Sequence, residues 1–178
     1  MQPKEEKELV AACIRNDRLA QKELYDRYAR VMMAVCMRYV GDKDRAQDVL
    51  QEAFIKVFVS LPSFTGSGSL EGWIRRIVVN TALESLRKCD VMRDAAAIED
   101  AEMQASVDVG VMERLSAEDL LGVIAALPPG FRTVFNMYAI EGYSHKEIAD
   151  MLGISEGTSR SQYNRARSLI QKKIQEMQ

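Results

Sequence analysis

The sequence has few of the residues that metal binding, disulfide formation and most catalysis require. Its 178 residues include one histidine, His145, and three widely separated cysteines, Cys13, Cys36 and Cys89. An odd number of cysteines without Cys-x-x-Cys spacing argues against a disulfide framework or a cysteine zinc site and is typical of free thiols in a reducing cytoplasm. We therefore expect a cytoplasmic protein with no metal site, no catalytic residues, no cofactor and no small-molecule substrate.

Long apolar segments and turn-forming residues are also scarce. The longest apolar run, Val31 to Met37, is far shorter than the roughly 20 residues that span a bilayer. The segment from Met1 to Glu6 shows no apolar signal-peptide stretch. With 4 prolines and 10 glycines the chain is poor in turn formers for an all-β protein, and its abundant Ala, Leu, Met, Glu, Arg and Lys favour helices. We expect an all-α fold.

The net charge of −2 conceals an uneven distribution. Residues 1–89 contain 15 Lys and Arg against 12 Asp and Glu, a net of +3. Residues 90–119 contain 2 against 9, a net of −7, and residues 120–178 contain 7 against 5, a net of +2. An isolated DNA-binding protein usually carries a strong positive excess, because phosphate neutralisation supplies most of its non-specific affinity. If this chain binds nucleic acid, we expect a partner to supply part of the electrostatics or to hold it in place.

Hydrophobic periodicity predicts two small helical domains, residues 1–89 and 117–178, joined by an acidic linker at residues 90–116. Asp17 is expected to break or cap the first helical segment, and Asp42 or Asp44 to cap the next one. The expected helices cover residues 9–39, 46–61, 70–89, 117–127 and 131–141, a short segment after Ser144, and residues 156–173.

The C-terminal segment carries the pattern of a helix-turn-helix unit. Ser144 followed by Glu147 is a capping box, Gly153 suits a positive φ at the end of a short helix, and Ser155 caps a longer one. In such a unit the second helix lies in the major groove of DNA. The residues on it that can contact bases or phosphates are Thr158, Arg160, Ser161, Gln162, Asn164, Arg165 and Arg167.

The opposite side of this second helix is expected to be buried, with Leu169 among its apolar residues. His145, in the first turn of the shorter helix, is expected to face solvent or phosphate. The alternative to DNA binding is a plain helical hairpin with a solvated basic face.

The N-terminal half offers two further sets of candidate residues. Asp48, Gln51 and Glu52 share one polar helix face, which by itself is most often solvated surface. Phe64 lies in a Gly/Ser loop and Trp73 opens the next helix. These aromatic side chains can stack on single-stranded bases or can fill the core. The same helix carries Arg75, Arg76, Arg87 and Lys88.

Together these motifs resemble those of extracytoplasmic-function (ECF) sigma factors. The resemblance to region 2 of that family lies in residues 48–54 (DVLQEAF) and 64–77 (FTGSGSLEGWIRRI), followed by Asn80. Region 4 is resembled by residues 127–132 (LPPGFR) and by the helix-turn-helix through Arg167. Both sets occur in the family's order and separation.

The resemblance implies a two-domain, all-helical initiation factor that binds bacterial RNA polymerase core and promoter DNA. It implies that Asp48, Gln51 and Glu52 dock on the largest core subunit. The loop from Phe64 to Trp73, with Asn80, would capture a −10 base beside the basic residues of its helix, and the helix-turn-helix would bind the −35 duplex. ECF factors are commonly held inactive by an anti-sigma factor, which makes one a candidate partner.

Three positions depart from the family pattern. Leu70 stands where an aromatic residue is frequent, Ser159 where an apolar residue is common, and Gln162 where an arginine is frequent. The −35 specificity of relatives is therefore not transferred to this chain.

Three other classes of protein compete with this interpretation. A stand-alone transcriptional regulator predicts tight duplex binding without polymerase, usually as a dimer. A protein-interaction module that sequesters a polymerase subunit predicts no effect of removing Arg160 and Arg165. An enzyme is the weakest alternative, because no phosphate-binding loop and no nucleophile–His–acid set is visible.

Overall fold

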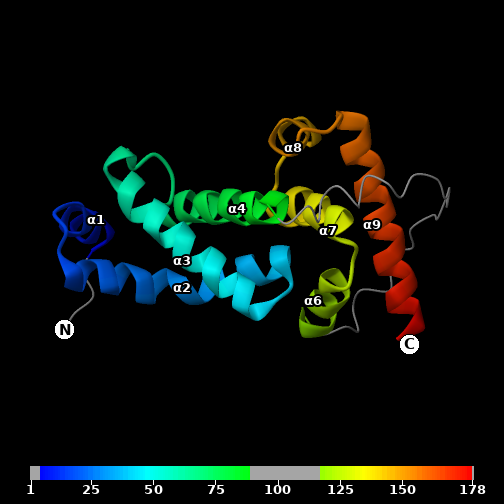
Figure 1. Ribbon diagram of the computed structural model, residues 1–178, viewed down its shortest axis with the longest axis horizontal. Helices are drawn as coiled ribbons and strands as arrows, with labels where there is room; N and C mark the ends of the chain where they lie inside the picture. Colours follow the sequence, from blue (N-terminus) through cyan, green and yellow to red (C-terminus); the bar gives the residue numbers. More distant parts are fainter. Residues whose placement is uncertain (1–4, 89–116, 178) are drawn as a thin grey trace. The chain divides into compact units, whose positions relative to one another are not determined.

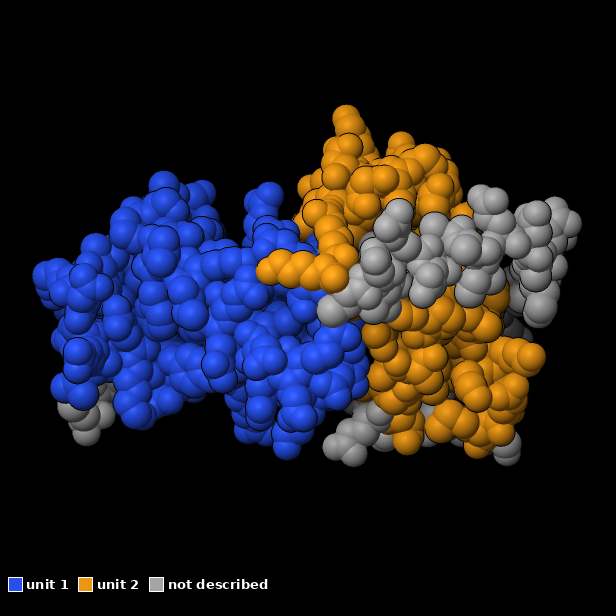
Figure 2. Space-filling model, viewed as in Figure 1, with its two compact units in different colours: residues 1–85 blue, residues 86–178 orange. Residues whose placement is uncertain are grey.

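The computed structural model describes residues 5–88 and 117–177 of the chain, and every secondary-structure element in these ranges is helical (Figure 1). The chain divides into two compact units, Met1–Ser85 and Leu86–Gln178 (Figure 2). The all-α fold is confirmed. The acidic linker predicted at residues 90–116 lies outside the described residues, and the predicted domain boundaries stay a prediction.

Short polar residues and a glycine set the helix boundaries of unit 1. The side chain of Asp17 accepts hydrogen bonds from the backbone N–H groups of Leu19 at 2.9 Å and Ala20 at 3.3 Å, which starts the second helix. Gly41 ends that helix with φ +73°, and Asp42 starts the next by accepting from the backbone N–H of Arg45 at 2.9 Å. The elements of this part of the chain are α1 (Glu6–Ile14), α2 (Arg18–Val40), α3 (Lys43–Ser60), the 3₁₀ turn η1 (Leu61–Ser63) and α4 (Leu70–Lys88).

The apolar stripe predicted for residues 46–61 forms part of the core of unit 1. Phe54 of α3 meets Tyr25 of α2 edge to face, with ring centroids 4.7 Å apart. Burying a valine, leucine or phenylalanine side chain stabilises a fold by about 1.5–3 kcal/mol, so this stripe fixes which face of α3 points outward. Its buried members are Ala46, Val49, Leu50, Ala53, Phe54, Val57 and Leu61. Cys13 and Cys36 are buried, and Cys89 lies outside the described residues.

Unit 2 packs its last long helix against the helices that precede the helix-turn-helix. Buried Arg132 donates a hydrogen bond from Nη1 to the carbonyl of Ala125 at 2.7 Å, which links two helices across the turn at Leu127. The apolar core comprises Val123, Ile124, Leu127, Phe131, Ala166, Ile170 and Ile174. The elements are α6 (Ala117–Ala125), α7 (Pro129–Phe135), a π-helical segment (Asn136–Ile140), α8 (His145–Leu152) and α9 (Glu156–Glu176).

Two local features of unit 2 differ in detail from what the sequence predicts. The single helix expected over residues 131–141 changes into a π-helical turn, where the N–H of Glu141 bonds the carbonyl of Asn136 at 2.9 Å. The wider turn alters which side chains face outward, and Tyr138 keeps 39% exposure. Leu169, expected in the core, is 37% exposed because it lies away from the buried stripe of α9. No described helix is long and apolar enough to cross a bilayer.

Candidate functional site

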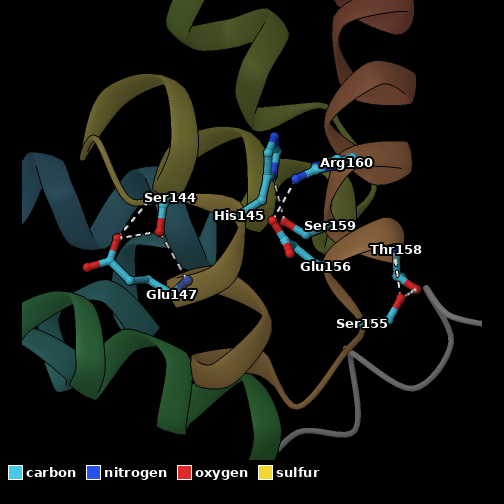
Figure 3. Close-up of polar contacts among 8 residues, drawn as sticks. All are labelled: Ser144, His145, Glu147, Ser155, Glu156, Thr158, Ser159 and Arg160. Atoms are coloured by element: carbon cyan, nitrogen blue, oxygen red, sulfur yellow. Dashed lines mark hydrogen bonds and ion pairs between the residues drawn. The ribbon is translucent and has the colours of Figure 1, made fainter.

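Three local capping features set the ends of α8 and the start of α9 (Figure 3). Ser144 Oγ accepts a hydrogen bond from the Glu147 N–H at 3.2 Å, and the Ser144 N–H donates to Glu147 Oε2 at 2.8 Å. Gly153 ends α8 with φ +69°. Ser155 Oγ accepts from the Thr158 N–H at 2.9 Å and so starts α9. The predicted capping box, turn glycine and second cap are confirmed.

One stripe of α9 is buried, and this stripe determines which side chains point outward. Ser159, Ala166, Ile170 and Ile174 are buried and recur at helical spacing. The predicted duplex-binding residues lie outside this stripe. Of these, Arg160, Ser161 and Asn164 are exposed, whereas Thr158, Gln162, Arg165 and Arg167 are half-buried.

The outward residues of α9 form a polar centre and a basic edge. Helical geometry places Ser161 near the middle of the outward face and Asn164 between it and one edge, along which Arg160 and Arg167 lie seven residues apart. Arg160 forms an ion pair with Glu156 at 2.6 Å, and the guanidinium of Arg167 lies 5.8 Å from the ring centroid of Tyr163. This layout suits phosphate contacts at the edge and base contacts at the centre.

His145 makes contacts that the sequence did not predict. Its ring stacks on Tyr138 with centroids 4.2 Å apart and planes 11° apart, and its Nδ1 shares a hydrogen bond with Ser159 Oγ at 2.9 Å. The expected solvent-facing side chain is therefore half-buried, because the π-helical segment and α9 both contact it. Burial lowers the pKa of His145 below 6.5, the positive charge of Arg160 lowers it further, and Glu156 acts in the opposite direction.

The outward face of α3 carries the three predicted core-docking residues. Asp48 and Gln51 are exposed, and Glu52 is half-buried with its carboxylate 3.0 Å from Lys56 Nζ. The same Lys56 reaches Glu84 of α4 at 2.6 Å. Burial by itself lowers the pKa of Lys56, but the hydrogen bonds to and charges of Glu84 and Glu52 together outweigh it and raise the pKa, so this ammonium stays charged and links the two helices.

Two exposed apolar residues on the same α3 face were missed from the sequence. Ile55 is 65% exposed and Val59 is 76% exposed. They follow Asp48 by seven and eleven residues, so all three share one helix face. Both residues lie outside the apolar stripe, which already contains the buried residues of this helix. Their exposure could therefore have been predicted from the sequence.

The two predicted base-stacking residues contact each other. Phe64 and Trp73 have ring centroids 5.4 Å apart, with planes tilted by 50°, and both side chains are half-buried. Gly66 and Gly68 have φ values of +75° and +91°, which allow the intervening loop to turn without strain. The rings therefore pack against each other while part of their surface stays accessible.

The predicted basic residues of α4 lie on two sides of the helix. Arg75 follows Trp73 by two residues, points to a different side and pairs with Glu71 at 2.9 Å. The side that carries Trp73 also carries four exposed polar residues, Arg76, Asn80, Arg87 and Lys88. Within residues 5–88 and 117–177, no group of His, Cys, Asp and Glu side chains could hold a metal ion.

Comparison with known proteins gives two family matches and full-length relatives. The family model for Sigma-70 region 2 matches residues 24–90, and that for Sigma-70 region 4 matches residues 117–170. The RNA polymerase sigma-H factor of Pseudomonas aeruginosa is 33% identical over 182 residues, covering 96% of this chain and 94% of that protein. The ECF RNA polymerase sigma-E factor of Haemophilus influenzae is 33% identical over 178 residues, covering 94% of both chains.

Two solved structures share the fold. The sigma factor RpoE in complex with the anti-sigma factor NepR from Bartonella quintana superposes with a TM-score of 0.52 at 20% identity, covering 85% of this chain and 94% of that one. CnrH in complex with the cytosolic domain of CnrY gives a TM-score of 0.50 at 24% identity, covering 94% and 95%.

Proposed function

The chain belongs to the ECF sigma factors, which direct promoter-specific transcription with RNA polymerase, and from this premise we propose how its faces divide the work. The proposal rests on one observation: the outward helix faces of the two matched regions carry different types of side chain. The region 2 segment carries an acidic and apolar face on α3 and an aromatic and basic face on α4. The region 4 segment carries the polar and basic face of α9.

The α3 face binds the polymerase core. Asp48, Gln51 and Glu52 supply the polar contacts, and Ile55 and Val59 extend the same face with apolar surface that a partner can cover. An exposed apolar patch edged by polar residues is typical of a protein-binding site. Residues 1–89 accordingly form the region 2 domain and residues 117–178 the region 4 domain, with residues 90–116 as the linker.

The α4 face and the loop before it bind the −10 element as single-stranded DNA. A base stacks on the Phe64–Trp73 pair while Arg76, Asn80, Arg87 and Lys88 contact the strand from the same side of α4. Arg75 lies on another side of α4 and does not contact the strand. It pairs with Glu71 and adds to the positive charge of the helix.

The α9 face binds the −35 element as duplex DNA. Asn164 and Arg165 can form bidentate hydrogen bonds with bases, and Thr158, Ser161 and Gln162 extend the polar face. Arg160 and Arg167 contact phosphates at its edge. The catalytic chemistry belongs to the polymerase, so this chain is a cytoplasmic binding factor and not an enzyme. An anti-sigma factor that covers the core-binding face would hold it inactive.

The test separates core binding from promoter selection. The Asp48→Ala/Glu52→Ala double variant should lose co-elution with bacterial core polymerase, whereas Leu19→Ala, an exposed change on α2, should retain it. The Asn164→Ala/Arg165→Ala double variant should co-elute normally but lose run-off transcription from promoters that the wild type uses. If the wild type shifts duplex DNA but ignores core polymerase, the chain acts alone and the proposal is wrong.

A further inference from the structure

One polar contact joins the two helices of the helix-turn-helix away from the turn itself. His145 is the first residue of α8 and Ser159 lies in the first turns of α9, fourteen residues later. Nδ1 of His145 and Oγ of Ser159 are 2.9 Å apart, and Ser159 has no solvent exposure. A buried hydroxyl that loses its hydrogen-bond partner destabilises the fold, so this bond favours one placement of α9 against α8.

Aromatic rings hold the imidazole on its other sides. Tyr138 of the π-helical segment stacks on the ring at 4.2 Å, and Tyr163 of α9 lies edge-on with its centroid 5.9 Å away. Tyr138 and Tyr163 also contact each other, with centroids 4.6 Å apart. His145 thus connects the π-helical segment, α8 and α9 through one side chain.

We propose that His145 is a positioning residue for duplex recognition, which holds the first turns of α9 through Ser159. The inference rests on the proposed −35 function of α9. The residues whose placement depends on this contact are the neighbours of Ser159, namely Thr158, Arg160, Ser161 and Gln162. Ser159 therefore acts through position, not by touching DNA, since it faces the protein interior.

The charges around His145 favour its neutral form. Arg160 of α9 disfavours a second positive charge, Glu156 of α9 partly offsets this effect, and these two side chains are paired at 2.6 Å. Tyr138 and Tyr163 contact the ring of His145, and Glu147 of α8 is engaged in the capping box. Burial and Arg160 together keep the pKa of His145 below its usual value.

The sign of the resulting pH dependence follows from this lowered pKa. A histidine whose pKa is lower in the folded state contributes its stabilisation above about pH 6.5, its unfolded value, and loses it as pH falls through the folded value. Docking of α9, and with it duplex affinity, should therefore decline on the acid side. A His145 that contacted phosphate directly would do the opposite, because protonation would strengthen that contact. His145 is the one histidine of the chain, so a change of affinity that this chain contributes near neutral pH can be assigned to it.

The experiment measures the affinity of the reconstituted polymerase holoenzyme for a promoter fragment between pH 5.5 and 8. The fragment carries a promoter that run-off transcription has identified. The variants are His145→Phe, which keeps an aromatic ring against Tyr138, Ser159→Ala, and the two combined. Each single variant should weaken binding by about fivefold, the equivalent of one neutral hydrogen bond. The double variant should bind more tightly than either single one, because it leaves no buried polar group without a partner.

The pH profile gives a second readout, which a purely structural loss in a variant would not produce. Relative to holoenzyme carrying His145→Phe, wild-type affinity should fall on acidification. A rise on acidification, or additive losses in the double variant, would overturn the positioning role while leaving the proposed −35 function intact. If wild-type holoenzyme retains no promoter fragment at any pH, the proposed function itself is wrong and the inference falls with it.

Discussion

The exposed apolar residues of α3 give the most quantitative prediction for core binding. Fully burying an isoleucine or valine side chain contributes about 1.5–3 kcal/mol. Ile55 is 65% exposed and Val59 is 76% exposed, so a partner that covers this face can still gain most of that energy. We expect Ile55→Ser and Val59→Ser each to weaken core binding by roughly 1–2 kcal/mol, or about 5- to 30-fold.

The same substitutions should leave the fold almost unchanged. Exposed positions away from special features usually alter the free energy of unfolding by less than about 0.5 kcal/mol, and serine and isoleucine have similar helix propensities. A suitable control is Leu19→Ser, because Leu19 is 66% exposed but lies on α2. Titration of labelled chain with core polymerase gives the affinities, and chemical denaturation gives the stabilities. Equal affinity of the α3 and α2 variants for core would refute the assignment of this face.

Three further predictions address individual elements. Gly153→Ala should lower the free energy of unfolding by about 1–2 kcal/mol in denaturant titration, because φ is +69° and the space around a new Cβ is open, which leaves backbone strain as the cost. Asp17→Ala should cost about 1 kcal/mol in the same assay through loss of the α2 cap, whereas Asp17→Asn should cost little, and equal losses would contradict the capping role. Arg76→Ala should weaken binding of holoenzyme to a single-stranded −10 probe more than Arg75→Ala does, because only Arg76 shares the face of Trp73; the reverse order would sink that assignment.

The local features of the fold were predictable from the sequence because they depend on neighbouring residues. The caps at Asp17 and Ser155 and the left-handed Gly153 each use atoms within three or four positions along the chain. The stripe of α3 was equally clear, since burial on one side repeats with the helical period. The π-helical turn after Phe135 was not predictable, because one wider turn leaves the apolar spacing on either side almost unchanged.

The candidate site was predicted in part, and the missing parts depend on distant contacts. Residue types and spacing identified the outward residues of α9, such as Asn164, before the structure placed them there. The partnership of His145 with Ser159 spans fourteen residues and needs the stacked ring of Tyr138, which no local pattern encodes. A polar residue in a buried stripe, such as Ser159, indicates that a partner exists without identifying it.

The direct test of the central claim is mapping of transcription start sites on genomic DNA of the source organism. Purified core polymerase is assayed alone, with the chain, and with its Asp48→Ala/Glu52→Ala variant. The account predicts that the wild-type chain directs initiation to a discrete set of start sites that share two upstream elements, and that core alone or with the variant does not. Unchanged start sites in the presence of the wild-type chain would contradict it.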